Sequence, residues 1–326
     1  MTNIPDDKPK MYILAGPNGS GKSTFLKKEF PPETIHLDAD EFSREIAKER
    51  YPDIPNDEIQ ALIDSDISLQ IGGSRRLRGK IKENIKNGLS FSAETTLSGK
   101  SYETHINNAK LNGFKINLLY VGTQSPDINV LRVSQRASEG KHDVPVETIE
   151  NRYNESLKRL SDFIKLSDKV KVYDNSIYGK EARLILSIEQ GKIIDVNKPI
   201  PKWVNDSVNE KLYPDLYEET RKDSKKEALR KVKELDKDSI TVNAQMNASI
   251  TGNIIAKTDY FVVQKYEGLE NKYIIHEIDK VPELHDCEIG ERVTIEYDHA
   301  GNGKIVENTH SDENSIELDD DLDIGD

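Results

Sequence analysis

Short apolar segments alternate with amphipathic stretches along the N-terminal part of the chain. The apolar segments have the length and the β-branched content that are typical of buried strands. Their alternation with helical stretches is typical of an α/β domain with a mostly parallel sheet. The predicted strands are Met11–Ala15, Thr34–Asp38, Ser90–Glu94, Lys115–Gly122 and Val170–Asp174.

Two longer stretches between these strands have a helical pattern, Glu58–Asn87 and Glu147–Leu166. In the second stretch, apolar residues recur at intervals of three and four, which places them on one face of a helix. After the last parallel strand, Arg183–Ile188 and Lys192–Val196 are separated by Glu189-Gln190-Gly191 and predict a short hairpin.

The composition changes after the segment Pro199–Trp203. Residues 206–237 are charged and favour a helix, so we expect a helical linker. The sequence that follows alternates β-branched and polar residues between turn signals and predicts a small β-barrel or curled sheet. We therefore expect an α/β domain over 1–205, a linker over 206–237, an all-β module over 238–310 and a tail over 311–326.

Charge and cysteine content narrow the class of protein. The net charge is −13, and residues 312–326 contribute eight acidic residues and no basic one, which is typical of a disordered tail. Such a balance makes nucleic acid an unlikely partner, because binding to it requires a basic surface. Cys287 is the single cysteine, and no apolar stretch is long enough to cross a membrane. We expect a cytoplasmic protein with a free thiol.

A phosphate-binding loop follows the first predicted strand. The segment GPNGSGKS matches the pattern G-x-x-x-x-G-K-[ST], and a helix is predicted to begin near residues 23–26. The expected nucleotide contacts are Gly16, Pro17, Asn18, Gly19, Ser20, Gly21, Lys22, Ser23 and Thr24. Lys22 should reach the β- and γ-phosphates, and the hydroxyl of Ser23 should bind Mg²⁺.

Other motifs separate the classes of P-loop protein. Leu97-Ser98-Gly99-Lys100 lacks the glutamine of an ABC signature, and the next apolar strand does not end in Asp-Glu. The guanine-binding pattern N-K-x-D does not occur. Small P-loop kinases place an acidic residue for the acceptor after the second strand, where this chain has Asp38 and Asp40. Asp40 is the favoured general base, whereas Asp38 either contacts Mg²⁺ or caps the next helix.

The ordered motifs GPNGSGKST, DADEF, SAETTLSG, RVSQRASEGKHDVP, YDNS and P-x-W resemble the zeta-toxin family over roughly residues 8–205. The nearer match is the branch that lacks a fused antitoxin and is often labelled a predicted ABC-type ATPase. The resemblance implies an ATP- and Mg²⁺-dependent kinase in which Asp40 is the general base. The choice of ATP over GTP rests on this resemblance alone.

The acceptor-binding residues are expected at the end of the third strand, at Glu94, Thr95 and Thr96, as the Glu-Thr element of the family implies. The alternative for the threonines is capping of the helix that begins near Gly99.

Three arginines are candidates for contacts with the transferred phosphoryl group, because its developing charge requires cations. Arg136 and Arg152 are expected to be catalytic, and Arg132 is expected to contact the acceptor. They flank residues 139–142, where Glu-Gly-Lys-His replaces the more usual Gly-Gly-His of the family. His142 is expected to position a lid. The alternative for each arginine is a solvated salt bridge.

The C-terminal module resembles the small β-module of KfrB-type plasmid proteins. The resemblance rests on a Thr-Asp pair, a strand that ends in Gln264, a strand that carries His276, and Gly290 before V-T-I-x-Y. His276 is expected to be a structural residue rather than a metal ligand.

Three functions are compatible with the sequence. The family implies a toxin kinase whose acceptor is a UDP-activated amino sugar, with a separately encoded antitoxin as a partner. A second reading keeps the kinase and changes the acceptor to NAD or another nucleotide. A third is an ATP-dependent switch or adaptor in plasmid maintenance, although the presence of Asp40 and Glu94 argues against a pure switch.

Overall fold

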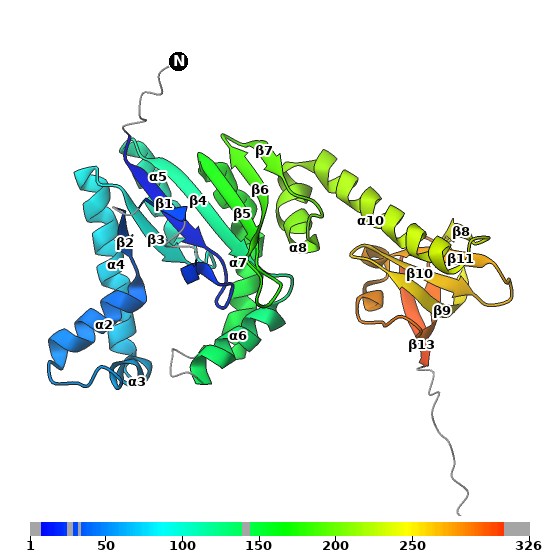
Figure 1. Cartoon of the computed structure of the whole chain (residues 1–326), viewed down its shortest axis with the longest axis horizontal. Coiled ribbons are helices and arrows are strands. Elements are labelled where there is room, and N and C mark those ends of the chain that lie inside the picture. Colours follow the sequence, from blue (N-terminus) through cyan, green and yellow to red (C-terminus); the bar gives the residue numbers. More distant parts are fainter. Residues whose placement is uncertain (1–7, 25–28, 32–33, 139–143, 310–326) are drawn as a thin grey trace, which may run out of the picture. The chain divides into compact units, whose positions relative to one another are not determined.

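The computed structural model describes residues 8–24, 29–31, 34–138 and 144–309 (Figure 1). Contacts between residues divide the chain into two compact units, Met1–Pro214 and Asp215–Asp326. Three predicted features lie wholly or partly outside the described residues: the helix that follows Ser23, the turn at 139–142 and the acidic tail.

The first unit is built on a seven-stranded sheet with the order β2-β3-β1-β4-β5-β6-β7. Five strands are parallel: β1 (Lys10–Ala15), β2 (Ile35–Leu37), β3 (Phe91–Thr95), β4 (Lys115–Gly122) and β5 (Lys169–Asp174). The hairpin of β6 (Arg183–Glu189) and β7 (Lys192–Val196) adds two antiparallel strands. The strands predicted from the sequence are confirmed to within one or two residues at each end.

Helices cover this sheet and extend beyond its β2 edge. The described helices of the first unit are α2 (Ala39–Arg50), α3 (Ile59–Ser65), α4 (Ile67–Asn87), α5 (Ser101–Leu111), α6 (Pro126–Ser138), α7 (Val146–Leu166), α8 (Lys202–Val204) and α9 (Glu210–Leu212). Helices α5 and α7 pack on β4, and α2 packs on α4. A short 3-10 helix, η1 (Lys22–Thr24), follows the phosphate-binding loop, and a π-helix, η2 (Asn205–Asn209), follows α8.

The single helix predicted over Glu58–Asn87 is wrong, because the chain breaks at Asp66. This residue has an extended backbone, with φ −113° and ψ 93°. Its carboxylate accepts a hydrogen bond from the backbone N–H of Ser68 at 2.8 Å and so caps α4. Aspartate favours this capping geometry over a position inside a helix.

The second unit is a six-stranded, mostly antiparallel sheet with the order β13-β12-β9-β10-β11-β8. Its strands are β8 (Ile240–Asn243), β9 (Ser249–Lys257), β10 (Phe261–Tyr266), β11 (Lys272–Glu277), β12 (Arg292–Tyr297) and β13 (Gly303–Thr309). The pair β8–β11 is parallel. Two 3-10 turns, η3 (Ile278–Lys280) and η4 (Pro282–His285), connect β11 to β12. The all-β module expected from the sequence is confirmed.

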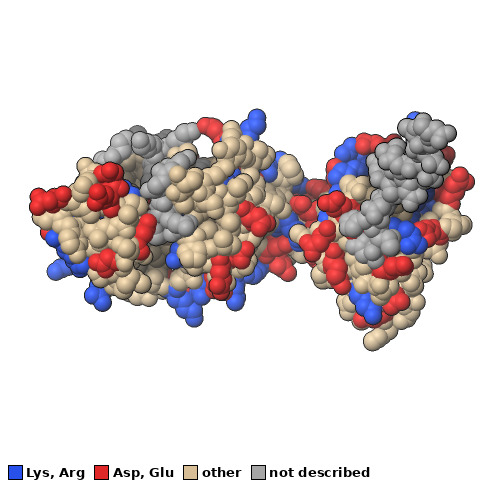
Figure 2. All heavy atoms as spheres, turned by 90° about the horizontal axis from the view of Figure 1, so that it is seen from below, with Lys and Arg blue, Asp and Glu red and all other residues tan. Residues whose placement is uncertain are grey.

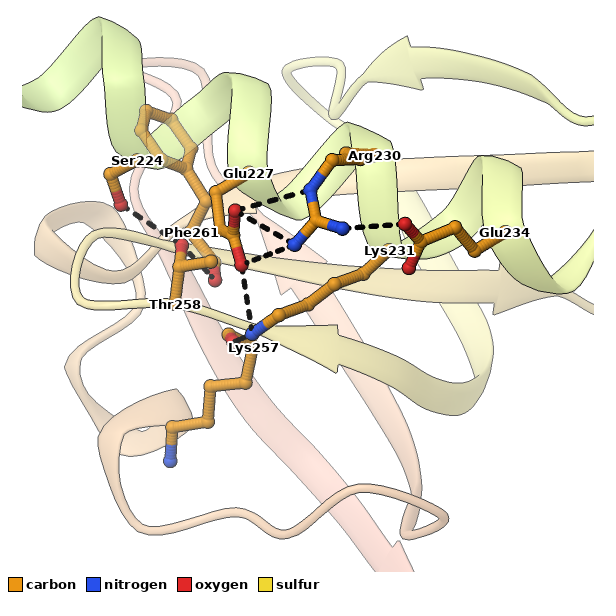
Figure 3. A network of polar contacts seen from close by, with 8 residues as sticks. All are labelled: Ser224, Glu227, Arg230, Lys231, Glu234, Lys257, Thr258 and Phe261. Atoms are coloured by element: carbon orange, nitrogen blue, oxygen red, sulfur yellow. Dashed lines mark hydrogen bonds and ion pairs between the residues drawn. The ribbon is translucent and has the colours of Figure 1, made fainter.

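Helix α10 (Pro214–Leu235) occupies most of the stretch that the sequence predicts to be a linker. Its C-terminal half does more than connect, because Ala228 and Val232 are fully buried against Ala256, Tyr260 and Val263 of the second unit. Polar contacts support the same packing (Figure 3). Lys231 Nζ donates to the carbonyl oxygen of Lys257 at 3.1 Å, and the hydroxyls of Ser224 and Thr258 lie 3.0 Å apart.

A buried polar network lies inside the second unit. The side-chain amide nitrogen of Gln264 donates to the carbonyl oxygens of Gly252 and Val293 at 2.9 and 2.7 Å. His276 contacts Gln264 Oε1 through Nε2 and the hydroxyl of Tyr297 through Nδ1, at 3.1 and 2.7 Å. Gln264 and His276 are fully buried, so these two motif residues of the module are core residues, as expected for His276.

The surface of the described chain is polar and mixed in charge. On the face that Figure 2 shows, acidic and basic side chains are interspersed on both units. Within the described ranges, we find no helix with the length and apolar character needed to cross a membrane.

Candidate active site

The carboxyl ends of the parallel strands bring together most of the residues singled out in the sequence. The register pairs Leu14 of β1 with Glu94 of β3, and Gly122 of β4 with Asp174 of β5. The phosphate-binding loop therefore emerges between the segments that follow β3 and β4. This edge is where open α/β sheets bind their ligands.

The loop fits closely against two neighbouring asparagines, which explains two of its glycines. Gly19 and Gly21 have φ values of 75° and 93°, which only glycine adopts without strain. A Cβ atom on Gly19 would lie 2.5 Å from the carbonyl oxygen of Asn129, and one on Gly21 would lie 2.4 Å from Nδ2 of Asn175. This tight backbone is what allows a phosphate-binding loop to curl around an anion.

Lys22 is held at the base of the loop. Its Nζ donates to the carbonyl oxygens of Gly16 and Pro17 at 2.8 and 3.0 Å. Burial lowers the pKa of Lys22 to about 8, and the nearby carboxylates of Glu94 and Asp40 partly oppose this shift. An anionic phosphate at the loop would favour the protonated form, so this lysine is suited to bind one.

Side chains from three other elements hold the loop in place. Nδ2 of Asn129, on α6, donates to the carbonyl oxygen of Asn18 at 2.6 Å, and Nδ2 of Asn175 donates to that of Ser20 at 2.8 Å. Nη1 of Arg152, on α7, donates to Oδ1 of Asn18 at 3.2 Å. The sequence singles out Arg152 but not the two asparagines, although Asn175 lies within the YDNS motif.

Asp38 has a structural contact that the sequence left open. It caps α2, because its Oδ1 accepts a hydrogen bond from the backbone N–H of Asp40 at 3.0 Å. Asp40 lies in the first turn of that helix. The cap fixes the backbone of Asp40 relative to the end of β2, and a carboxylate in the first turn is stabilised by the helix dipole.

Glu94 is the most perturbed carboxylate of the described site. Its pKa is raised to about 7, mainly by burial; Lys22 and Arg136 oppose this shift, and Asp38 and Asp40 add to it. The same groups act on Lys22. Residues from the loop, from the ends of β2 and β3 and from α6 thus share one electrostatic environment, which is typical of an active site.

Two further residues contact Glu94 and were missed in the sequence. His36 lies opposite Ser92 in the β2–β3 register, and its Nδ1 is 3.0 Å from Oγ of Ser92. Its Nε2 is 3.9 Å from Oε1 of Glu94. The hydroxyl of Tyr102 donates to the carbonyl oxygen of Glu94 at 2.6 Å. Only the tertiary pairing brings these residues together, so no local pattern could have identified them.

The hydroxyls of Thr95 and Thr96 stabilise the turn after β3. Oγ1 of Thr95 accepts a hydrogen bond from the backbone N–H of Leu97 at 3.0 Å, and Oγ1 of Thr96 is 2.9 Å from Oγ of Ser98. Leu97 has a φ of 61°, so this turn needs such support. Neither hydroxyl makes the described hydrogen bonds of a cap on α5, whose N-cap is Lys100.

The arginines of α6 line a cavity beside the loop. The cavity has a volume of about 590 Å³. Residues of the loop, of α6 and of the segment after β5 surround it, among them Gly21, Arg132, Arg136, Asn175 and Tyr178. Nη1 of Arg132 is buried and has no hydrogen-bond partner among the described residues. The structure thus places Arg132 on the side of the loop that faces the segment after β5.

Ser23 is the residue that could hold a metal ion. Its side chain is exposed just after the loop, in η1. A hydroxyl oxygen suits Mg²⁺, which takes few protein ligands and completes its shell with phosphate oxygens and waters. Within the described ranges, no group of three or more histidine, cysteine or carboxylate side chains is placed to hold a metal ion.

Comparisons with known proteins agree with this geometry. The zeta toxin family model matches residues 1–184, and the KfrB domain model matches residues 249–307. A Haemophilus influenzae protein described as uncharacterized is 31% identical over 144 residues, which are 44% of this chain and 92% of that protein.

Among solved structures, a chain of the AvrRxo1-ORF1:-ORF2 structure with ATP is similar to this chain. That match has a TM-score of 0.46 and 17% identity, and it covers 58% of this chain and 61% of the other. Another is from the PezAT toxin-antitoxin system of Streptococcus pneumoniae. Its TM-score is 0.44 with 16% identity, and it covers 68% of this chain and 86% of the other.

The parallel sheet, the phosphate-binding loop and the acidic residues beside it define an α/β fold of the P-loop kinase type. The family match covers more than half of the chain. The protein belongs to the zeta toxin family and carries a C-terminal KfrB domain.

Proposed function

We propose that this protein is a kinase that transfers the γ-phosphoryl group of ATP to a hydroxyl group of a small nucleotide-linked acceptor, a UDP-activated amino sugar. It acts as a toxin whose partner is a separately encoded antitoxin. The observation that supports the transfer reaction is the electrostatic environment beside the loop, which is shared by Lys22, Asp40, Glu94 and Arg136. The acceptor and the toxin role rest on the family alone.

The nucleotide would lie along the loop, with its phosphates on the backbone N–H groups and on Lys22. The base would occupy the cavity beside Arg132 and Tyr178, a residue that is 74% exposed. Arg132 is therefore proposed as a nucleotide contact in addition to the acceptor contact expected from the sequence. Mg²⁺ held by Ser23 would neutralise charge on the phosphates.

The acceptor would enter from the side of Asp40 and Glu94. Asp40 would take the proton of the attacking hydroxyl, and Glu94, Thr95 and Thr96 would hold the polar edge of the sugar. Arg136 and Arg152 would stabilise the charge that develops on the phosphoryl oxygens. The resemblance to the family supports the role of Asp40, and the electrostatic environment shared by Lys22, Glu94 and Arg136 supports a site beside the loop.

The test is a transfer assay with γ-labelled ATP, Mg²⁺ and a panel of UDP-sugars, NAD and free sugars. Asp40→Asn should reduce the rate by about 10²–10⁴-fold without weakening ATP binding, because it removes only the base. Lys22→Ala should reduce the transfer rate and weaken ATP binding. Asp53→Asn, an exposed carboxylate in the loop after α2, is the matched control and should leave the rate unchanged.

Each result has a definite meaning. Transfer of the label to NAD alone would mean that NAD is the acceptor in place of a UDP-activated amino sugar, and that the protein is still a kinase. ATP binding without transfer to any acceptor, unchanged in Asp40→Asn, would overturn the kinase and favour an ATP-dependent adaptor. The toxin role requires that expression of the wild-type chain arrests growth and that expression of Asp40→Asn does not.

A further inference from the structure

The segment Asp174–Ser176 connects the nucleotide loop to a tryptophan that lies outside the parallel sheet. Asn175 holds the loop through its bond to the carbonyl oxygen of Ser20. The backbone of Asn175 is itself fixed, because its N–H donates to the carbonyl oxygen of Gly122 at 2.9 Å. The position of Asn175 therefore depends on what holds the residues on either side of it.

Asp174 is held from two directions. Its Oδ1 accepts a hydrogen bond from Nε1 of Trp203 at 2.9 Å and another from Oγ of Ser176 at 2.6 Å. Oγ of Ser176 in turn accepts a hydrogen bond from the backbone N–H of Gln124 at 2.8 Å. Hydrogen bonds to a carboxylate are stronger than neutral ones, so this arrangement fixes the segment firmly.

Trp203 contacts the ends of the two neighbouring strands β4 and β5. It belongs to α8, is 5% exposed and packs against Tyr120 of β4, with ring centroids 5.9 Å apart. A Cβ atom on Gly122 would lie 2.5 to 2.8 Å from three atoms of the indole ring, so the ring lies directly on the end of β4. The ring packs on β4 while its N–H reaches the end of β5.

We propose that Trp203 is a positioning residue for nucleotide binding: its indole N–H fixes Asp174, and thereby Asn175 and the loop. If Trp203 only packed against β4, an aromatic ring without an N–H group would be enough. The N–H has a second function, because it donates to the carboxylate next to the asparagine that holds the loop. The effect on affinity rests on the ATP binding proposed above, whereas the effect on the loop itself does not.

Three variants separate the N–H from the ring. Trp203→Phe keeps an aromatic ring and removes the N–H, and Asp174→Ala removes the acceptor without touching the core. Tyr120→Phe is the matched control, because it breaks a buried hydrogen bond of the same strand end, between the Tyr120 hydroxyl and Oγ of Ser156 at 2.9 Å. That bond has no described connection to the loop.

The first measurement is hydrogen exchange of the peptide that covers residues 14–22, in the full chain without nucleotide. Trp203→Phe and Asp174→Ala should each raise exchange there by about tenfold, since the loop loses a support, whereas Tyr120→Phe should not. Equal exchange in Trp203→Phe and Tyr120→Phe, at comparable thermal stability, would show that Trp203 only packs.

The second measurement is calorimetric titration with ATP and Mg²⁺. Each of the two variants should raise the Kd by about tenfold, and the double variant should bind no more weakly than Asp174→Ala alone, because Asp174→Ala already removes the hydrogen bond that Trp203→Phe removes. Additive losses would overturn the proposal. A wild-type chain that does not bind ATP would refute the proposed function, while the exchange experiment would still decide the role of Trp203.

Discussion

Gly73 of α4 lies against Ser43 of α2 so closely that a Cβ atom on Gly73 would be 2.1 Å from the Ser43 Oγ. The same Cβ atom would be 2.4 Å from the carbonyl oxygen of Ala39, the first residue of α2. The backbone of α4 therefore forms the surface on which the first turn of α2 rests. Asp40 is part of that turn, so the close packing at Gly73 helps to determine the position of the proposed base.

Gly73→Ala should reduce the rate of phosphoryl transfer by about tenfold or more and leave ATP affinity unchanged. The added methyl group must push the first turn of α2 away, and displacements of about 1 Å at a catalytic group are costly. The variant should also lose about 1–3 kcal/mol of stability from overpacking. The measurements are kcat with the acceptor that the transfer assay identifies and the Kd for ATP.

Gly79→Ala is the control for this prediction. Gly79 is on the same helix, and a Cβ atom there would meet no atom within 4 Å. The Gly79→Ala variant should keep full activity and gain up to about 1 kcal/mol of stability from helix propensity. Full activity in Gly73→Ala would mean that α2 adjusts without moving Asp40.

Glu94→Gln should stabilise the fold at pH 8 by roughly 2–3 kcal/mol and abolish phosphoryl transfer. The pKa of Glu94 is raised from 4.5 to about 7 in the folded chain, mainly by burial. The folded state therefore binds more protons than the unfolded state between these values, and its stability falls as the pH rises through this window. A neutral amide avoids that loss above pH 7.

Urea unfolding at pH 5 and pH 8 checks this prediction. The stability difference between Glu94→Gln and the wild type should be small at pH 5 and large at pH 8. Glu58→Gln, an exposed glutamate at the start of α3, should show no such dependence. A pH-independent difference would mean that Glu94 titrates near its ordinary pKa and that the site does not hold it in a perturbed state.

Much of the fold and the nucleotide loop could be predicted because the decisive patterns are local. Strands β1 to β5 are short apolar runs, and the loop motif lies between a strand and η1. Asn129, Asn175 and His36 could not be predicted in the same way. Each is a single polar residue whose partner lies more than 50 positions away in the chain.

The helical linker predicted over 206–237 is a different case. Residues 206–237 are rich in charge, and the sequence gives no strong apolar stripe there, so composition favours a solvated connector. Ala228 and Val232 are the side chains of α10 that are completely buried, and both pack on the second unit. The compact second unit begins at Asp215, at the start of this helix rather than after it.

Val232→Ala should destabilise the second unit by about 2 kcal/mol. Val232 is fully buried beside Tyr260 and Val263, so the change removes two buried methyl groups and leaves a cavity. Leu235→Ala is the matched control on the same helix, because Leu235 is 70% exposed, and it should change stability by less than about 0.5 kcal/mol. Hydrogen exchange of the β10 and β11 amides in the full chain measures the stability change in each variant. Equal effects would show that α10 is only a connector.

The stability of the second unit should fall with acidification between pH 6.5 and pH 3, because of His276. Gln264 uses its amide nitrogen as a donor to two backbone carbonyls, so its Oε1 must accept the hydrogen bond from Nε2–H of His276. Nδ1 then accepts from the hydroxyl of Tyr297. The imidazole is neutral, and a second proton at Nδ1 would force the hydroxyl of Tyr297 to change from donor to acceptor and would place a charge in a buried site.

Burial lowers the pKa of His276 from 6.5 to about 3. The unfolded chain therefore binds more protons than the folded one in this window, and stability is lost as the pH falls from 6.5 toward 3 at up to about 1.4 kcal/mol per pH unit. Exchange of the β10 and β11 amides, corrected for the intrinsic pH dependence, should follow this slope. His276→Gln should be less stable at pH 7 and lack the slope between pH 6.5 and about 4.5, above the range in which carboxylates titrate, whereas His285→Gln, at an exposed position, should retain it. If wild type and His276→Gln lose stability in parallel on acidification, the network tolerates a charged imidazole and the tautomer assigned to it is wrong.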